Sequence, residues 1–134
     1  MSRPIKFRGL PIEDYGPVKW FYGSAIMNYE DKLAYIEADG QGTVPIIWDT
    51  VGQYTGLHDR NGKEIYEGDI VYTPQFDWTG YVVFTGDCQY ALKGKTELGN
   101  DGYVLFTQIY LNECEVIGNI YEHPHLQKGV VEDA

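Results

Sequence analysis

The chain has 134 residues, enough for one ordinary domain or two very small ones, and a hydrophobic content of 43% excludes a disordered protein. The formal net charge is -10, and residues 51–134 carry most of it, because five basic and thirteen acidic residues there give 5 − 13 = −8. A duplex-binding protein normally has a basic stripe, whereas the densest basic cluster here is Lys93 with Lys95. The acidity favours solubility, or an acidic face that docks on a basic partner.

The start of the chain, MSRPIKFRG, has no apolar run of the kind found in secretion signals. No segment approaches the roughly 18 apolar residues that a membrane helix needs. We therefore expect a cytoplasmic protein with no membrane partner. Cys88 and Cys114 lie among strand-like residues, so we expect both to be reduced and buried.

Short strands separated by turn residues are predicted in the first fifty residues. Gly23 is expected to mark a bulge or a close backbone approach. Pro45 cannot donate a hydrogen bond, which predicts that Val44–Trp48 is an edge strand or a strand entry. An edge strand needs cover, which favours a homo-oligomer. The expected strands are residues 5–7, 19–27, 33–38 and 44–48.

The later strands recur at intervals of roughly ten to fifteen residues, which is typical of a barrel or a sandwich. Asn61-Gly62 is the strongest hairpin signal in the chain. Residues 94–102 are predicted to be a mobile loop, and residues 127–134 are predicted to fray. The expected strands are residues 53–57, 64–66, 70–72, 79–85, 89–92, 103–109 and 115–121. A composition shift near residue 50 predicts an N-terminal β region, residues 1–50, sharing a core with a compact barrel over residues 51–134.

Four sequence blocks occur along the chain in a distinctive order: IKFRG, KWFYG, TVGQYTGLHDRNGKEIYEGDIV and EVIGNIYEHPHL. Together they resemble the YopX-like family of small proteins that phages and prophages of Gram-positive bacteria encode. His58, Arg60, His123 and His125 depart from the family pattern. The motif positions that we interpret as structural are Gly52, Gln53, Tyr54, Gly56, Asn61, Gly62, Glu67, Gly68, Asp69, Gly118 and Asn119.

The resemblance implies a mainly β fold: an N-terminal β-strand layer and a C-terminal SH3-type small β-barrel. It also implies a phage gene product made in the host bacterial cytoplasm. It brings no established activity, catalytic residue or cofactor.

Two groups of side chains are candidates for chemical sites. His58, His123 and His125 could join Asp59 or Glu122 around a metal ion, but two of these histidines flank a proline, so we interpret them as surface or capping residues. Among the carboxylates, Asp69 follows Gly68 at a turn, where it is expected to accept backbone N–H bonds. The other clustered carboxylates are Glu64, Glu67, Glu113 and Glu115.

No nucleophile motif is present, because Ser2 and Ser24 are the only serines and neither lies in a GxSxG turn. No phosphate-binding loop of the P-loop or GxGxxG type occurs either. We therefore predict a protein that is not an enzyme and uses no metal or other cofactor.

Aromatic residues are the remaining candidates for binding. Phe76 and Trp78 lie in a predicted loop, where no strand period buries them, and we group them with Tyr54, Tyr72 and Tyr81. The alternative is that these rings cover the core or form a subunit interface. Our leading hypothesis is a non-catalytic interaction module for a host or phage protein.

Two other functions stay open. One is a small barrel that binds nucleic acid, with Arg60, Lys93 and Lys95 near phosphates, although the net charge opposes it. The other is an acidic decoy that imitates the charge of DNA.

Overall fold

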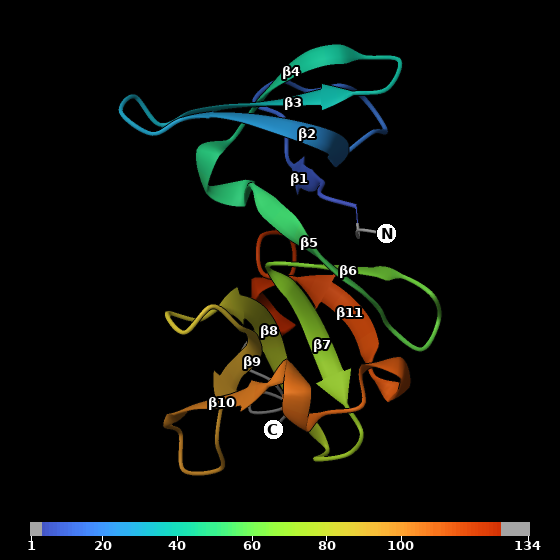
Figure 1. Ribbon diagram of the computed structural model, residues 1–134, viewed down its shortest axis with the longest axis vertical. Coiled ribbons are helices and arrows are strands. Elements are labelled where there is room, and N and C mark those ends of the chain that lie inside the picture. Colours follow the sequence, from blue (N-terminus) through green and yellow to red (C-terminus); the bar gives the residue numbers. More distant parts are fainter. Residues whose placement is uncertain (1–3, 127–134) are drawn as a thin grey trace. The chain divides into compact units, whose positions relative to one another are not determined.

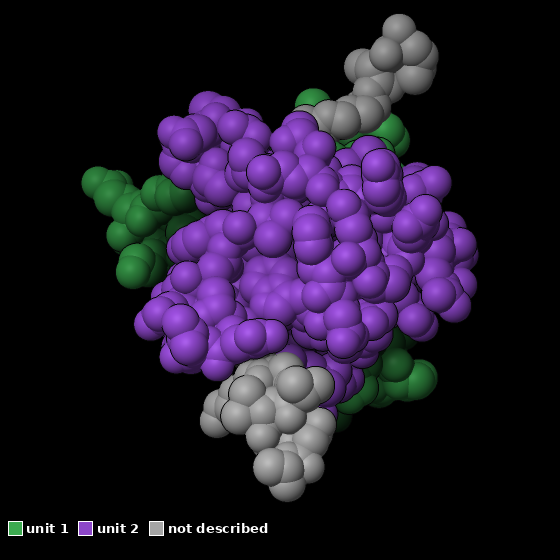
Figure 2. All heavy atoms as spheres, turned by 90° about the horizontal axis from the view of Figure 1, so that it is seen from below, with its two compact units in different colours: residues 1–56 green, residues 57–134 purple. Residues whose placement is uncertain are grey.

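The structure is a computed structural model that describes residues 4–126, and the predicted fraying of residues 127–134 lies outside this range. The chain is mainly β, with two antiparallel sheets (Figure 1). It divides into two compact units, residues 1–56 and 57–134, which Figure 2 colours green and purple. No helix within residues 4–126 has the length and apolar character needed to span a membrane.

The first unit is built on a twisted sheet of consecutive hairpins. Its strands are β1 (Phe7–Gly9), β2 (Phe21–Asn28), β3 (Leu33–Ala38), β4 (Gly42–Ile46) and β5 (Gly52–His58), with a 3-10 turn η1 (Trp48–Thr50) before β5. The order is β4-β3-β2-β1-β5-β6, and β5 runs across the boundary between the units. Alternate residues face inward, and the buried cluster comprises Phe21, Ala34, Ile36, Val44 and Ile46.

Two predictions about this sheet are tested by its geometry. Gly23 is a close backbone approach, as predicted, because a Cβ there would collide with the carbonyl oxygen of Glu37 on β3. β4 is an edge strand, one of the two alternatives predicted for Val44–Trp48, but it begins at Gly42 and ends at Ile46, before Trp48 starts η1. The chain itself covers this edge, since the Ile12 N–H donates to the Pro45 carbonyl at 3.1 Å and the Ile47 N–H donates to the Leu10 carbonyl at 2.8 Å. These bonds cover one end of the edge, and the homo-oligomer stays a prediction.

The second unit contains β6 (Glu64–Tyr66) and a five-stranded sheet in the order β10-β9-β8-β7-β11 (Figure 1). The strands are β7 (Asp69–Thr73), β8 (Trp78–Phe84), β9 (Tyr90–Lys95), β10 (Asp101–Leu105) and β11 (Glu115–Asn119), and 3-10 turns η2 (Phe106–Gln108) and η3 (Leu111–Glu113) lie between the last two. The buried cluster is Ile65, Val71, Val82, Leu92, Ile109, Cys114 and Val116. Neither sheet closes into a barrel within the described residues.

Three predictions for the second unit were wrong. Residues 94–102 are not a loop, because Gly94 and Lys95 belong to β9, β10 begins at Asp101, and only a short turn separates them. The strand predicted over residues 103–109 ends at Leu105, where the chain turns into η2. Cys88 is exposed in a turn with φ 65°, whereas Cys114 is buried as expected. Strand composition alone cannot detect a left-handed turn residue.

Candidate binding surface

The central sequence motif forms a turn that is organised around the carboxylate of Asp59. Its Oδ1 accepts the backbone N–H groups of Asn61 at 2.8 Å and Lys63 at 2.9 Å. Its Oδ2 accepts the buried N–H of Val116 on β11 at 2.9 Å. Burial by itself raises the pKa of Asp59, but the N–H donors of Val116, Lys63 and Asn61 and the charge of Lys63 outweigh it, so the pKa is lowered. Asp59 therefore joins the two motif blocks as a structural anion.

Other polar side chains at the turns of this unit also bond backbone groups. The buried carboxylate of Asp69 accepts the Tyr66 N–H at 2.7 Å. The Asn119 side-chain oxygen accepts the N–H groups of Tyr121 at 3.0 Å and Glu122 at 2.9 Å. The ring of His123 accepts the Asn119 N–H through Nδ1 at 3.2 Å. These side chains hold turns together at the ends of β7 and β11.

Two of the three histidines contact each other. The rings of His123 and His125 meet edge to face, with centroids 6.3 Å apart. Among residues 4–126, no group of three or more His, Cys, Asp and Glu side chains is placed to hold a metal ion.

The five aromatic residues predicted to bind do not form one surface. Tyr54 lies in the first unit and is 2% exposed, so its ring is part of the interior, with the Lys6 ammonium 5.4 Å from its centroid. Tyr72, Phe76, Trp78 and Tyr81 lie in the second unit, and Phe76 has the most exposed side chain of these four. The sequence shows that Tyr54 is aromatic, but it does not show on which face of its strand Tyr54 lies.

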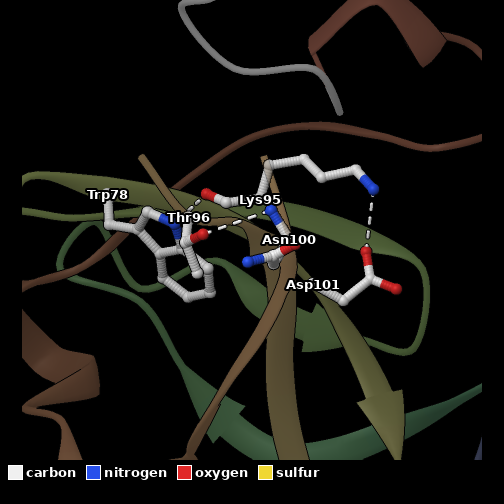
Figure 3. A network of polar contacts seen from close by, with 5 residues as sticks. All are labelled: Trp78, Lys95, Thr96, Asn100 and Asp101. Atoms are coloured by element: carbon white, nitrogen blue, oxygen red, sulfur yellow. Dashed lines mark hydrogen bonds and ion pairs between the residues drawn. The ribbon is translucent and has the colours of Figure 1, made fainter. Parts of the chain in front are cut away.

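Trp78 has a structural role at the start of β8 (Figure 3). Its indole N–H donates to the carbonyl oxygen of Lys95 at 2.8 Å, which ties β8 to the β9–β10 hairpin. Its ring fills the space that glycines leave, because a Cβ on Gly94 would lie 2.8 Å from it and a Cβ on Gly80 would lie 3.2 Å from it. The ring also packs on the core of the second unit. Trp78 is therefore a poor candidate for a partner-binding residue.

The β7–β8 turn, in contrast, presents Phe76 on an ordered frame. The Gln75 side chain donates to the Gln108 carbonyl at 3.4 Å and accepts the Tyr110 N–H at 3.2 Å, so it ties the turn to the segment after η2. The Tyr72 hydroxyl donates to Asp77 Oδ1 at 2.7 Å, and this hydrogen bond raises the pKa of Tyr72. The turn is thus fixed at both ends.

Two aromatic residues of this frame are exposed. Phe76 is 49% exposed and directly follows Gln75, whereas Tyr110 is 63% exposed and donates its backbone N–H to the Gln75 side chain. We call Gln75, Phe76 and Tyr110 the Gln75 surface. Sequence analysis missed Tyr110, because its link to Gln75 spans 35 positions and no local pattern marks it.

Comparisons with known proteins give a family and a distant structure. Residues 17–128 match the protein family described as YopX protein. No curated protein matches the chain. Among solved structures, the chain is similar to the crystal structure of protein EF1440 from Enterococcus faecalis, with 24% sequence identity and a TM-score of 0.38, over 94% of this chain and 99% of that one.

Proposed function

Because this chain belongs to the YopX protein family, we propose that it is a non-catalytic accessory protein of a bacteriophage, which acts in the host cytoplasm by binding a host or phage protein. The Gln75 surface is the proposed contact region. Rigid aromatic residues are enriched among the residues that dominate protein–protein binding energy.

The exposure of Phe76 and Tyr110 on a fixed frame is the observation that carries the proposal. Large apolar side chains that stay exposed on an ordered turn lose little conformational freedom when a partner covers them. The hydrogen bonds of Gln75 and the Tyr72–Asp77 pair supply this order before any partner arrives.

The carboxylates of the motif support a non-catalytic role. General acid–base catalysis needs carboxyl groups that can reach a substrate. Asp59 and Asp69 are 5% and 1% exposed, and backbone N–H groups donate to both oxygens of Asp59 and to Oδ2 of Asp69. Their chemistry is that of fixed structural anions.

We further propose that the second unit is an SH3-type arrangement. Its support is the five-stranded order β10-β9-β8-β7-β11, in which the last strand pairs with the first, and the 3-10 turns that precede β11. Small domains of this type commonly bind peptides beside such turns.

The test is a pull-down of the tagged chain from extract of phage-infected host cells, with and without nuclease, analysed by mass spectrometry. The test variant is the double substitution Phe76→Ala with Tyr110→Ala. Leu98→Ala is the matched control, because Leu98 is an apolar side chain that is 87% exposed at a different turn of the same unit.

We expect a stoichiometric protein partner that survives nuclease, is retained by the Leu98 control and is lost by the double variant. A partner retained equally by all three proteins would refute the Gln75 surface. Recovery that disappears with nuclease would favour nucleic-acid binding instead.

A further inference from the structure

A second surface on the same unit lies on the outer face of β8, β9 and β10. The strand registers place Tyr81 opposite Lys93, and Lys93 opposite Tyr103, so the three side chains form one row across the sheet. The neighbouring register row, Val82 and Leu92 with Val104, points the other way and packs in the core. The row therefore faces away from the core of the second unit.

Lys93 is a cation held by aromatic groups. Its ammonium lies 5.6 Å from the centroid of the Tyr103 ring. A hydrogen bond with the side chain of Tyr103, and then electrostatic interactions with Tyr81 and Tyr103, raise the pKa of Lys93. Lys95, two residues further on the same face, is instead paired with Asp101 at 2.9 Å (Figure 3). Within residues 4–126 Lys93 forms no such ion pair, although the charge of Asp101 also acts on it, so a ligand carboxylate competes with that longer-range attraction and not with a bound partner.

An apolar hollow adjoins this cation. It has a volume of about 510 Å³ and is lined by Val83, Phe84, Thr85, Gly86, Lys93 and Tyr103. Phe84 and Tyr103 are 53% and 56% exposed. Apolar walls with a single charged group are the usual composition of a ligand site.

We propose that this hollow binds an extended peptide segment in which a carboxylate lies beside an apolar side chain. The carboxylate pairs with Lys93 between the tyrosines, and the apolar side chain enters the hollow against Val83 and Phe84. Lys93 supplies one positive charge, which matches one carboxylate, and the apolar walls match one apolar side chain. The net charge of residues 57–134, 5 − 13 = −8, disfavours a ligand that carries many negative charges.

Small probes test the chemistry directly. The ¹⁵N-labelled full chain is titrated with N-acetyl-phenylalanine, with its uncharged amide, and with the oligonucleotide (dT)6, and amide chemical shifts are recorded. We expect N-acetyl-phenylalanine to shift the signals of residues 83–86, 93 and 103 and to bind about tenfold more tightly than the amide.

Two lysine variants make the assignment specific. Lys93→Gln should lower the affinity for N-acetyl-phenylalanine about tenfold. The Lys95→Gln variant should bind it as tightly as the unmodified chain does, although this substitution removes the same charge from the same strand face. Both lie on the outer face, so correct folding is checked by their unchanged core amide signals. Any of three results would overturn the proposal: equal affinities for N-acetyl-phenylalanine and its amide, an equal loss of affinity in both lysine variants, or a higher affinity for (dT)6 than for N-acetyl-phenylalanine.

This inference is independent of the Gln75 surface. The residues of the two surfaces do not overlap, so the double variant of Phe76 and Tyr110 should still bind N-acetyl-phenylalanine. Loss of partner capture with retained probe binding would separate the two activities.

Discussion

Replacing Asp59 by asparagine should destabilise the second unit strongly, although the two side chains have nearly the same shape. The asparagine oxygen can still accept from Asn61 and Lys63, but its NH₂ group then faces the N–H of Val116, donor against donor. Leaving that buried N–H unsatisfied costs about 1–3 kcal/mol, and weakening two charge-assisted bonds adds about 1 kcal/mol.

We therefore expect a loss of about 3 kcal/mol in the free energy of unfolding at pH 7. With a urea slope of about 1.5 kcal/mol/M, the unfolding midpoint should fall by about 2 M. The measurement is urea unfolding followed by amide NMR signals of the second unit. Asp87→Asn is the control, since Asp87 is exposed in the same unit, and it should change stability by less than about 0.5 kcal/mol.

The pH dependence gives a second check on the same carboxylate. The pKa of Asp59 is lower in the folded chain than in the unfolded one, so its ionised form stabilises the fold above the unfolded value of about 4. That contribution is lost as the pH falls through the folded pKa. The difference in free energy of unfolding between the unmodified chain and Asp59→Asn should therefore become smaller below pH 4. An Asp59→Asn variant as stable as Asp87→Asn at pH 7 would refute the reasoning.

Two further predictions concern the second unit. Gly94→Ala should lower the free energy of unfolding by about 1–3 kcal/mol, because the added methyl group would clash with the Trp78 ring and with backbone atoms, whereas a methyl group on Gly86 meets nothing within 4 Å and Gly86→Ala should be tolerated. Thermal unfolding of both variants tests this, and equal melting temperatures would contradict it. Iodoacetamide should modify the exposed Cys88 rapidly, but it should modify Cys114 only after denaturation, because Cys114 is buried and burial raises the pKa of its thiol. Peptide mass spectrometry measures the modification rate of each cysteine, and equal rates would contradict the burial of Cys114.

Local pattern predicted those strands whose limits are set by their own residues. Residues 33–38 and 64–66 were predicted with the limits that β3 and β6 have, because apolar alternation and flanking turn residues coincide there. The Asn61-Gly62 turn was likewise visible, with the Gly62 N–H donating to the Asp59 carbonyl at 3.0 Å.

Features that depend on distant residues were not predictable. β9 continues through Gly94 because the ring of Trp78, from another strand, occupies the space beside it. The local sequence indicates only that Asp59 is a turn residue, because its hydrogen bond from the N–H of Val116 spans 57 positions. The row of Tyr81, Lys93 and Tyr103 exists only in the strand register, which composition does not specify.

The hydrogen bond between Asp59 and Val116 also has a consequence for synthesis on the ribosome. Its partners are 57 positions apart, and β7 pairs on one side with β11, the last strand in the described part of the chain. At a chain elongation rate of roughly 5–20 residues per second, Val116 is synthesised roughly 3–11 s after Asp59. During that interval the nascent chain exposes one edge of β7 and an incomplete core, whereas the strands of residues 1–56 have already been made. The first unit can therefore fold while the second still depends on protection from aggregation, and shortening the chain before Val116 should leave only the second unit unfolded.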